Sequence, residues 1–178
     1  GLMSERRPKN ELAKFVFKRG LWLIFCEVVI ISTALSFSPT GMAPFGGATL
    51  AFLQVLFAMG VSMVVLSGAL YLGIRNCFII GAVIMLGHNL LDPIWPMSAP
   101  FGDGSEPMWA ALHSPTTIIL KPFYLVVMYP PLAWVGIMLM GFGSSFIFKK
   151  EPAKRDLLLK KIGLSMMAAF VIIRTFGF

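Results

Sequence analysis

The sequence predicts an all-α fold, a polytopic bundle of about five transmembrane helices. Of its 178 residues, 57% are hydrophobic and only 13% are charged, whereas soluble domains average about 45–50% apolar and about 25% charged residues. An apolar excess of this size cannot be enclosed in the core of so short a chain. We therefore expect residues 1–178 to form a single membrane-embedded helical domain.

Five segments are apolar enough to serve as spans, because crossing the hydrocarbon core takes roughly 20 residues of helix. The second is the clearest, and the third is so short that its ends must lie near the interfaces or be shielded by neighbours. Pro130 and Pro131 interrupt the fourth near its start, and the fifth begins with amphipathic turns. The five segments are residues 20–37, 50–72, 76–91, 123–148 and 157–178.

The distribution of basic residues indicates how these spans are oriented. The net charge is +7, but the 15 Lys and Arg flank the apolar runs and do not form the continuous face that nucleic-acid binding needs. If the five spans alternate in direction, 13 of these 15 residues fall on the side of the N-terminus, and Lys and Arg accumulate on the cytoplasmic side. We therefore expect an integral membrane protein with a cytoplasmic N-terminus and an extracytoplasmic outer segment, residues 92–122.

Three polar residues meet at the outer end of the third span, in the stretch GHNLLDPI (87–94). His88 and Asp92 are four residues apart and Asn89 and Asp92 are three apart, so on a helix all three share one face. Pro93 disfavours helical backbone in the residue before it, which predicts that the helix ends at Asp92. One interpretation is a hydrated helix end whose side chains satisfy the last carbonyl groups. The other is a cluster that lines an external pocket.

The outer segment adds a second histidine and aromatic residues to these candidates. A metal site is the weaker option, because only His113 is placed to complete one, and we expect no metal. Ser105 as a helix cap predicts a short helix through Leu112. Aromatic residues at this depth form an interfacial belt or, alternatively, the floor of a sugar site. The aromatic candidates are Trp95, Trp109, Tyr129 and Trp134.

Glu27 is an acidic residue inside the first span, about 12 Å past Arg19 by helical rise. A carboxylate at that depth costs several kcal/mol unless it is paired, hydrated or protonated. We favour a hydrogen bond that stabilises the bundle by joining Glu27 to another span. The alternative is a proton-relay or site carboxylate.

Small residues and cysteines in the spans indicate packing. Gly141 and Ser145 have the small-xxx-small spacing of closely packed transmembrane helices. Cys26 and Cys77 lie in apolar runs, and two such cysteines make neither a disulfide framework nor a metal site. We therefore interpret both cysteines as packing residues.

Five sequence blocks carry a family resemblance. They are FKRGLWLIFCEVVII (17–31), LQVLFAMGVSMVVLSGALYL (53–72), GHNLLDPI (87–94), MWAALH (108–113) and YPPLAWVGIMLMGFG (129–143). In this order they resemble the bacterial heparan-alpha-glucosaminide N-acetyltransferase-like membrane family. Two positions depart from the family pattern: Phe57 stands where the family usually has tryptophan, and Ala133 where it has a proline before tryptophan. The second change removes a backbone restraint near the outer face.

The resemblance implies an integral membrane acyltransferase of the bacterial cytoplasmic membrane, which transfers an acetyl group across the membrane from acetyl-CoA on one side to an amino sugar or another glycan on the other. Members of the family are larger, and their N-terminal spans, with the histidine taken to handle the acetyl group, have no match in this chain. That role is therefore not carried over to His88 or His113. We expect the chain to be a fragment of a larger acyltransferase-like domain.

Acyl transfer needs a base near the acceptor amine and hydrogen-bond donors at the thioester carbonyl. His88 and Asp92 are the catalytic candidates, on the acceptor side. Two other functions stay open: a transporter or channel subunit with Glu27 and His88 on a proton or solute path, and a structural membrane protein. Expected partners are membrane lipid and a glycan acceptor but not nucleic acid, and self-association is left open. The substrate-binding candidates are Asn89, His113, Trp95, Trp109, Tyr129, Trp134 and Glu27.

Overall fold

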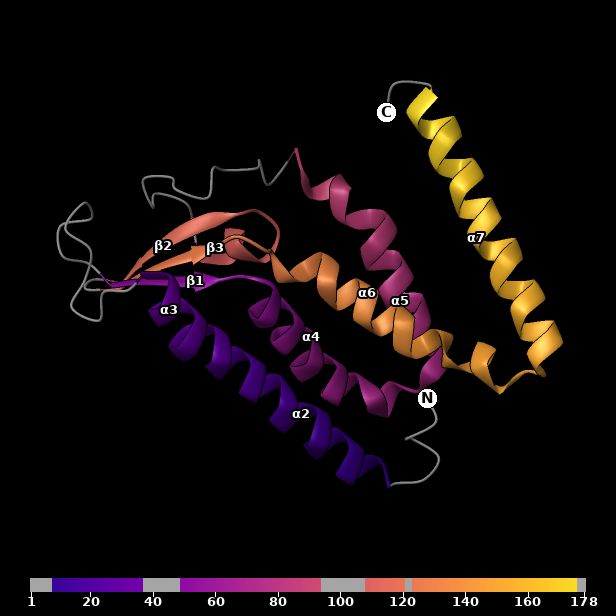
Figure 1. The fold of residues 1–178 in the computed structure, drawn as a ribbon, viewed down its shortest axis with the longest axis horizontal. Coiled ribbons are helices and arrows are strands. Elements are labelled where there is room, and N and C mark those ends of the chain that lie inside the picture. The colour runs from indigo at the N-terminus through magenta and orange to yellow at the C-terminus, as the bar shows by residue number, and fades with distance from the viewer. Residues whose placement is uncertain (1–7, 37–48, 94–107, 121–122, 176–178) are drawn as a thin grey trace.

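The structure, a computed structural model, describes residues 8–36, 49–93, 108–120 and 123–175 (Figure 1). Four helices lie side by side, and a small sheet adjoins one end of this layer (Figure 1). In spatial order the helices are α2 (Lys9–Phe25), α4 (Val55–Ala69), α6 (Pro131–Gly143) and α5 (Ile74–Gly87).

Glycines let the helices of this layer approach closely. A Cβ atom on Gly20 of α2 would lie 2.7 Å from the carbonyl oxygen of Gly60 in α4. Between α5 and α6, a Cβ atom on Gly81 would lie 2.5 Å from the amide nitrogen of Met140. Glycine at these positions is therefore required by packing. The prediction that Gly141 serves close packing is wrong, because a Cβ atom there would meet nothing within 4 Å.

A three-stranded sheet adjoins the helices, so the all-α prediction is wrong at this end of the molecule. Strand β1 (Thr49–Leu53) pairs in parallel with the central strand β3 (Phe123–Val127), and β2 (Thr116–Leu120) pairs antiparallel with β3. The strands are rich in β-branched and aromatic residues, but short apolar runs cannot be distinguished from buried helix by pattern alone. Strand β1 leads into α4 and β3 into α6, so the sheet fixes where both helices begin.

Among the described residues, three helical segments are long and apolar enough to cross a membrane. They correspond to the predicted second, third and fourth spans, although the second and fourth begin later than predicted because their first residues form strands. The predicted first span is helical but is divided by the π-helix η1 (Cys26–Ile31), which α3 (Ser32–Ser36) follows. The predicted count of about five spans is therefore not confirmed. The three segments are Val55–Leu72, Ile74–Leu91 and Pro131–Lys149.

The last helix, α7 (Pro152–Thr175), stands apart from the layer (Figure 1). It follows the 3-10 helix η6 (Ser144–Lys149), and none of its residues is buried. The predicted fifth span covers most of α7. Within α7, however, the longest stretch without a charged residue is 162–173. That stretch is about 18 Å long at helical rise, shorter than the hydrocarbon core.

Candidate functional site

The polar cluster at the end of α5 lies where the helix tightens and stops. The α-helix continues as the 3-10 helix η4 (His88–Leu91), and a turn follows at Asp92 and Pro93. The amide of Asp92 donates a hydrogen bond to the carbonyl oxygen of Asn89 at 3.2 Å. The helix therefore ends at the residue before Pro93, as the sequence predicts.

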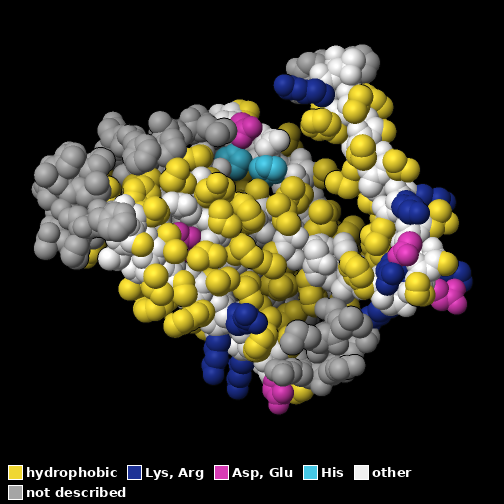
Figure 2. Space-filling view, in the orientation of Figure 1, with side chains coloured by type: hydrophobic (Ala, Val, Ile, Leu, Met, Phe, Trp, Pro, Cys, Tyr) yellow, Lys and Arg dark blue, Asp and Glu magenta, His cyan; other side chains and the backbone are white. Residues whose placement is uncertain are grey.

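A pocket of about 210 Å³, the polar pocket, lies beside this turn. Three segments that are distant in the sequence supply its walls: the η4 turn, His113 after the 3-10 helix η5 (Met108–Leu112), and the start of α6. Figure 2 shows both histidines close together on one face of the molecule. The structure thus brings the predicted cluster and His113 together. The lining residues are His88, Asn89, Asp92, His113, Pro130, Ala133 and Trp134.

Asp92 and His113 are paired in this pocket. The Nε2 atom of His113 lies 2.8 Å from Oδ1 of Asp92, and because a carboxylate only accepts, Nε2 must carry the proton. The side chain of His113 is 5% exposed and that of Asp92 is 51% exposed. The imidazole is therefore held by its surroundings, while the carboxylate stays accessible to a ligand.

His88 is held through its Nδ1 atom, whereas His113 is held through Nε2. The Nδ1 atom of His88 lies 3.0 Å from the carbonyl oxygen of Met85, and a carbonyl only accepts, so this bond requires the proton on Nδ1. In the neutral ring, Nε2 then carries the lone pair. The rings of His88 and His113 meet edge-on, with centroids 6.1 Å apart and planes at 74°. A neutral His88 can therefore accept a proton at Nε2.

The predicted aromatic residues separate into three groups. Trp134 lines the polar pocket, and Tyr129 packs edge-on against Trp134 with ring centroids 6.1 Å apart. Trp109 lies on η5, is 50% exposed and is not a lining residue. Trp95 lies outside the described residues. Of the three described residues, only Trp134 contributes directly to the pocket wall.

Glu27 is not part of the pocket but lies at the start of α4. Its Oε2 atom accepts hydrogen bonds from the backbone N–H groups of Leu56 (2.8 Å) and Phe57 (3.2 Å). A side chain just before a helix usually makes these bonds, but Gln54 does not, so Glu27 caps α4 from the neighbouring helix. Its charge also faces the positive end of the helix dipole. The structure shows the predicted hydrogen bond to another span.

The π-helix connects this cap to the sheet. The hydroxyl of Ser32 accepts a hydrogen bond from the amide of Phe52 in β1 at 2.9 Å and lies 2.9 Å from the carbonyl oxygen of Glu27. Glu27 is 2% exposed and so is Ser32. The widened turn therefore places one buried carboxylate and one buried hydroxyl where they fix β1 and the start of α4.

Pro130 and Ala133 line the polar pocket although we did not predict them as site residues. Their position depends on strands β2 and β3, which carry the chain from His113 back to the start of α6. The sequence contains a signal for these two strands, namely the β-branched and aromatic runs TTIIL and FYLVV on either side of residues 121–122.

The charges of the pocket differ from those of the rest of the molecule. Among the described residues, its lining includes one carboxylate and two imidazoles but no Lys or Arg. In Figure 2, most Lys and Arg side chains lie away from the histidines, around the opposite end of α2 and the start of α7. The pocket therefore suits a cationic or neutral polar ligand better than a phosphate, which Arg and Lys would bind.

Comparison with known proteins gives the chain a family. A family model described as heparan-alpha-glucosaminide N-acetyltransferase, catalytic, matches residues 2–175. No match was found among curated proteins or among solved structures. Because the matched residues span almost the whole sequence, the chain belongs to the family of heparan-alpha-glucosaminide N-acetyltransferase catalytic domains.

Proposed function

We propose that this protein takes part in membrane acetyl transfer to an amine, and that the polar pocket binds the acceptor. The observation that carries the proposal is the convergence of His88, Asn89, Asp92 and His113 on one pocket. A hydrated helix end does not require His113, which comes from a separate segment. Family membership supports acetyl transfer as the reaction.

The pocket supplies the groups that an acceptor amine needs. Asp92 attracts the ammonium form, because its half-exposed carboxylate is the one negative charge among the described lining residues. His88 takes the proton that the amine must lose, at Nε2. The free amine then forms the new bond to the acetyl carbon as the carbon–sulfur bond of the thioester breaks, and the released thiolate takes up the proton that the new amide nitrogen loses. Asn89 can donate a hydrogen bond to a polar group of the acceptor.

Acetyl-CoA, which supplies the acetyl group as a thioester, fits this pocket poorly as a whole molecule. The volume of about 210 Å³ is below the roughly 300–1,000 Å³ of pockets for drug-sized ligands. The described lining residues also include no Lys or Arg that could bind the phosphates of coenzyme A. We therefore assign the described pocket to the acceptor, an amino sugar or a related glycan end, and leave the phosphates to other residues.

The orientation of the protein follows from its charges. The Lys and Arg residues of α2, and those around the start of α7, lie away from the polar pocket (Figure 2). Because basic residues collect on the cytoplasmic side, we place the pocket and residues 92–122 on the extracytoplasmic side of a bacterial cytoplasmic membrane. The acceptor would then be modified outside the cytoplasm.

The transporter alternative has less support. It would need Glu27 and His88 on one continuous path. Glu27 is engaged with the backbone of α4 and does not line the polar pocket. A structural role for Glu27 therefore explains its burial without a proton path.

The proposal is tested by acetyl-CoA-dependent acetylation of glucosamine in membranes that carry the full-length protein. His88→Ala should lower turnover by about 10²–10⁴-fold, because it removes the base. Leu90→Ala is the matched control, since Leu90 lies in the same 3-10 turn, is 78% exposed and does not line the pocket. Wild-type turnover in His88→Ala at equal protein level would remove His88 from the mechanism.

A further inference from the structure

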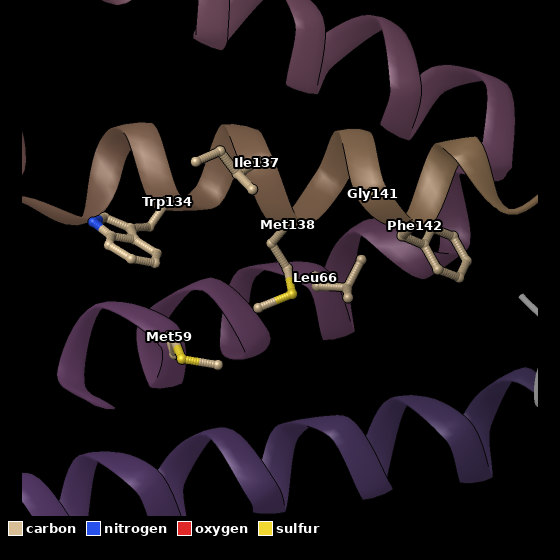
Figure 3. Close-up of a pocket in the computed structure, with 7 residues that line it drawn as sticks. All are labelled: Met59, Leu66, Trp134, Ile137, Met138, Gly141 and Phe142. Atoms are coloured by element: carbon tan, nitrogen blue, oxygen red, sulfur yellow. The ribbon is translucent and has the colours of Figure 1, made fainter. Parts of the chain in front are cut away.

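An apolar cavity of about 440 Å³, the α4–α6 groove, lies between α4 and α6. Figure 3 shows Met138 and Leu66 in the space between the two helices, with Trp134 at one end and Phe142 at the other. Both helices belong to membrane-length apolar segments, Val55–Leu72 and Pro131–Lys149. The groove therefore lies at the depth of the hydrocarbon core. The described part of its lining contains no charged residue and includes Met59, Leu66, Trp134, Met138 and Phe142.

The lining of this groove is accessible and adaptable. Met59 is 36% exposed and Ile137, also in the lining, is 48% exposed. The flexible thioethers of Met59 and Met138 can adjust to occupants of different shape. At Gly141 a side chain would have open space around its Cβ atom, so the absence of one widens the groove. These properties favour a flexible hydrocarbon occupant.

The groove and the polar pocket meet at one residue, Trp134. Trp134 lines both cavities, with Ala133 beside it in the polar pocket and Ile137, one turn later, in the groove. In Figure 3 its indole nitrogen points away from the Phe142 end of the groove. One aromatic side chain thus forms the boundary between an apolar trough at membrane depth and a polar pocket with a carboxylate.

We propose that the natural acceptor is a lipid-linked amine, with its hydrocarbon chain in the α4–α6 groove and its amine in the polar pocket. The inference rests on the proposed function, because it names the class of acceptor for the same site. From Trp134 to Phe142 the groove follows eight residues of helix, about 12 Å at helical rise. A chain segment of that length would anchor the acceptor while its amine meets Asp92 and His88.

A lipid chain suits the groove as its occupant. The lining of the groove is apolar, and a hydrocarbon chain is narrow and flexible. It is also available from the surrounding bilayer, and the negative charge of Asp92 lies next to the end of the groove where a cationic amine would follow the chain.

The test compares two acceptors, glucosamine and its decyl glycoside, in membranes carrying the full-length protein. Gly141→Leu should place a side chain in the groove and lower kcat/KM for the decyl glycoside about tenfold more than for glucosamine. Gly68→Leu is the matched control, because a Cβ atom on Gly68 in α4 also meets nothing within 4 Å and Gly68 does not line the groove. The decyl chain also partitions into the membrane, which favours the decyl glycoside equally in all variants. The effect of the groove is therefore measured by how much the preference for the decyl glycoside differs between variants.

Each outcome decides between the two proposals. Acetylation of neither acceptor by the wild-type protein would overturn the proposed function. Acetylation of both, with equal losses in Gly141→Leu or the same selective loss in Gly68→Leu, would overturn the lipid-linked acceptor and leave the proposed function intact. Ile137→Ser provides a second variant if Gly141→Leu does not accumulate, because Ile137 is half exposed. The same selective loss for the decyl glycoside is expected from it.

Discussion

Asp92 and Glu27 are two carboxylates near the sheet end of the helix layer, in opposite surroundings. Glu27 is 2% exposed and accepts two backbone hydrogen bonds at the start of α4. The side chain of Asp92 is 51% exposed and is paired with His113 at the edge of a pocket. The bonds of Glu27 are satisfied within the fold, whereas Asp92 stays accessible to a ligand. The difference separates a carboxylate that holds the scaffold from one that can act on a substrate.

The comparison also shows how the two regions are linked. Ser32 ties the turn that carries Glu27 to β1, and β1 pairs with β3, which leads into the α6 segment that lines the polar pocket. The Glu27 region therefore positions one wall of the pocket without touching it. We expect substitutions there to change stability first, and substitutions in the pocket to change activity first.

Of the two carboxylates and the residues linked to them, Asp92 should show the largest effect on catalysis when it is replaced, in Asp92→Asn. Loss of the charge should reduce kcat/KM for glucosamine by about 10²-fold or more, because the ammonium loses its partner and the hydrogen bond from His113 loses its charged acceptor. The free energy of unfolding should change by less than about 0.5 kcal/mol, as at other accessible positions. Steady-state kinetics and thermal unfolding in detergent measure the two quantities. Asp156→Asn, which alters an exposed carboxylate of α7, is the control, and equal kinetics in both variants would contradict the assignment.

The second effect is on stability, in Glu27→Ala. The change leaves two amides of α4 without their partner and should lower the free energy of unfolding by about 3 kcal/mol. Glu151→Ala removes an exposed carboxylate paired with Lys154, and should cost less than about 1 kcal/mol. Thermal unfolding in detergent compares the two variants. If Glu27→Ala is as stable as Glu151→Ala, then the cap does not hold α4.

The smallest effect is expected in Ser32→Ala. The amide of Phe52 loses its hydroxyl partner, which should cost about 1–2 kcal/mol at a buried site. Ser144→Ala is the control, because the Ser144 hydroxyl bonds a carbonyl of its own helix and its loss leaves no amide unpaired. If Ser32→Ala unfolds at the same temperature as Ser144→Ala, the proposed link between the π-helix and the sheet is wrong.

Much of the membrane architecture could be predicted because it depends on composition and long apolar runs. The second and third spans and the end of the third helix before Pro93 follow directly from these signals. The sheet could not be predicted, because Thr49–Leu53 and Phe123–Val127 are apolar runs that continue into helices. Their separation from those helices depends on pairing between segments about 70 residues apart, which no local pattern records.

The candidate site could be predicted only in part, because only some of its contacts are local in the sequence. His88, Asn89 and Asp92 share one short turn, so local spacing brings them together. The pairing of Asp92 with His113 depends on tertiary structure, and Glu27 was noticeable in the sequence only as a charge at membrane depth. Its role as a cap depends on the approach of α4, which the sequence does not encode locally.

The central claim is that the polar pocket binds the acceptor on the extracytoplasmic side. Asn89→Cys and Asn76→Cys place cysteines at exposed positions at opposite ends of α5, and both are treated with a membrane-impermeant thiol reagent in intact cells. We predict that Asn89→Cys is labelled, that glucosamine slows this labelling, and that Asn76→Cys is labelled only after permeabilisation. Labelling of Asn76→Cys alone in intact cells, or labelling of Asn89→Cys that glucosamine does not slow, would contradict the account.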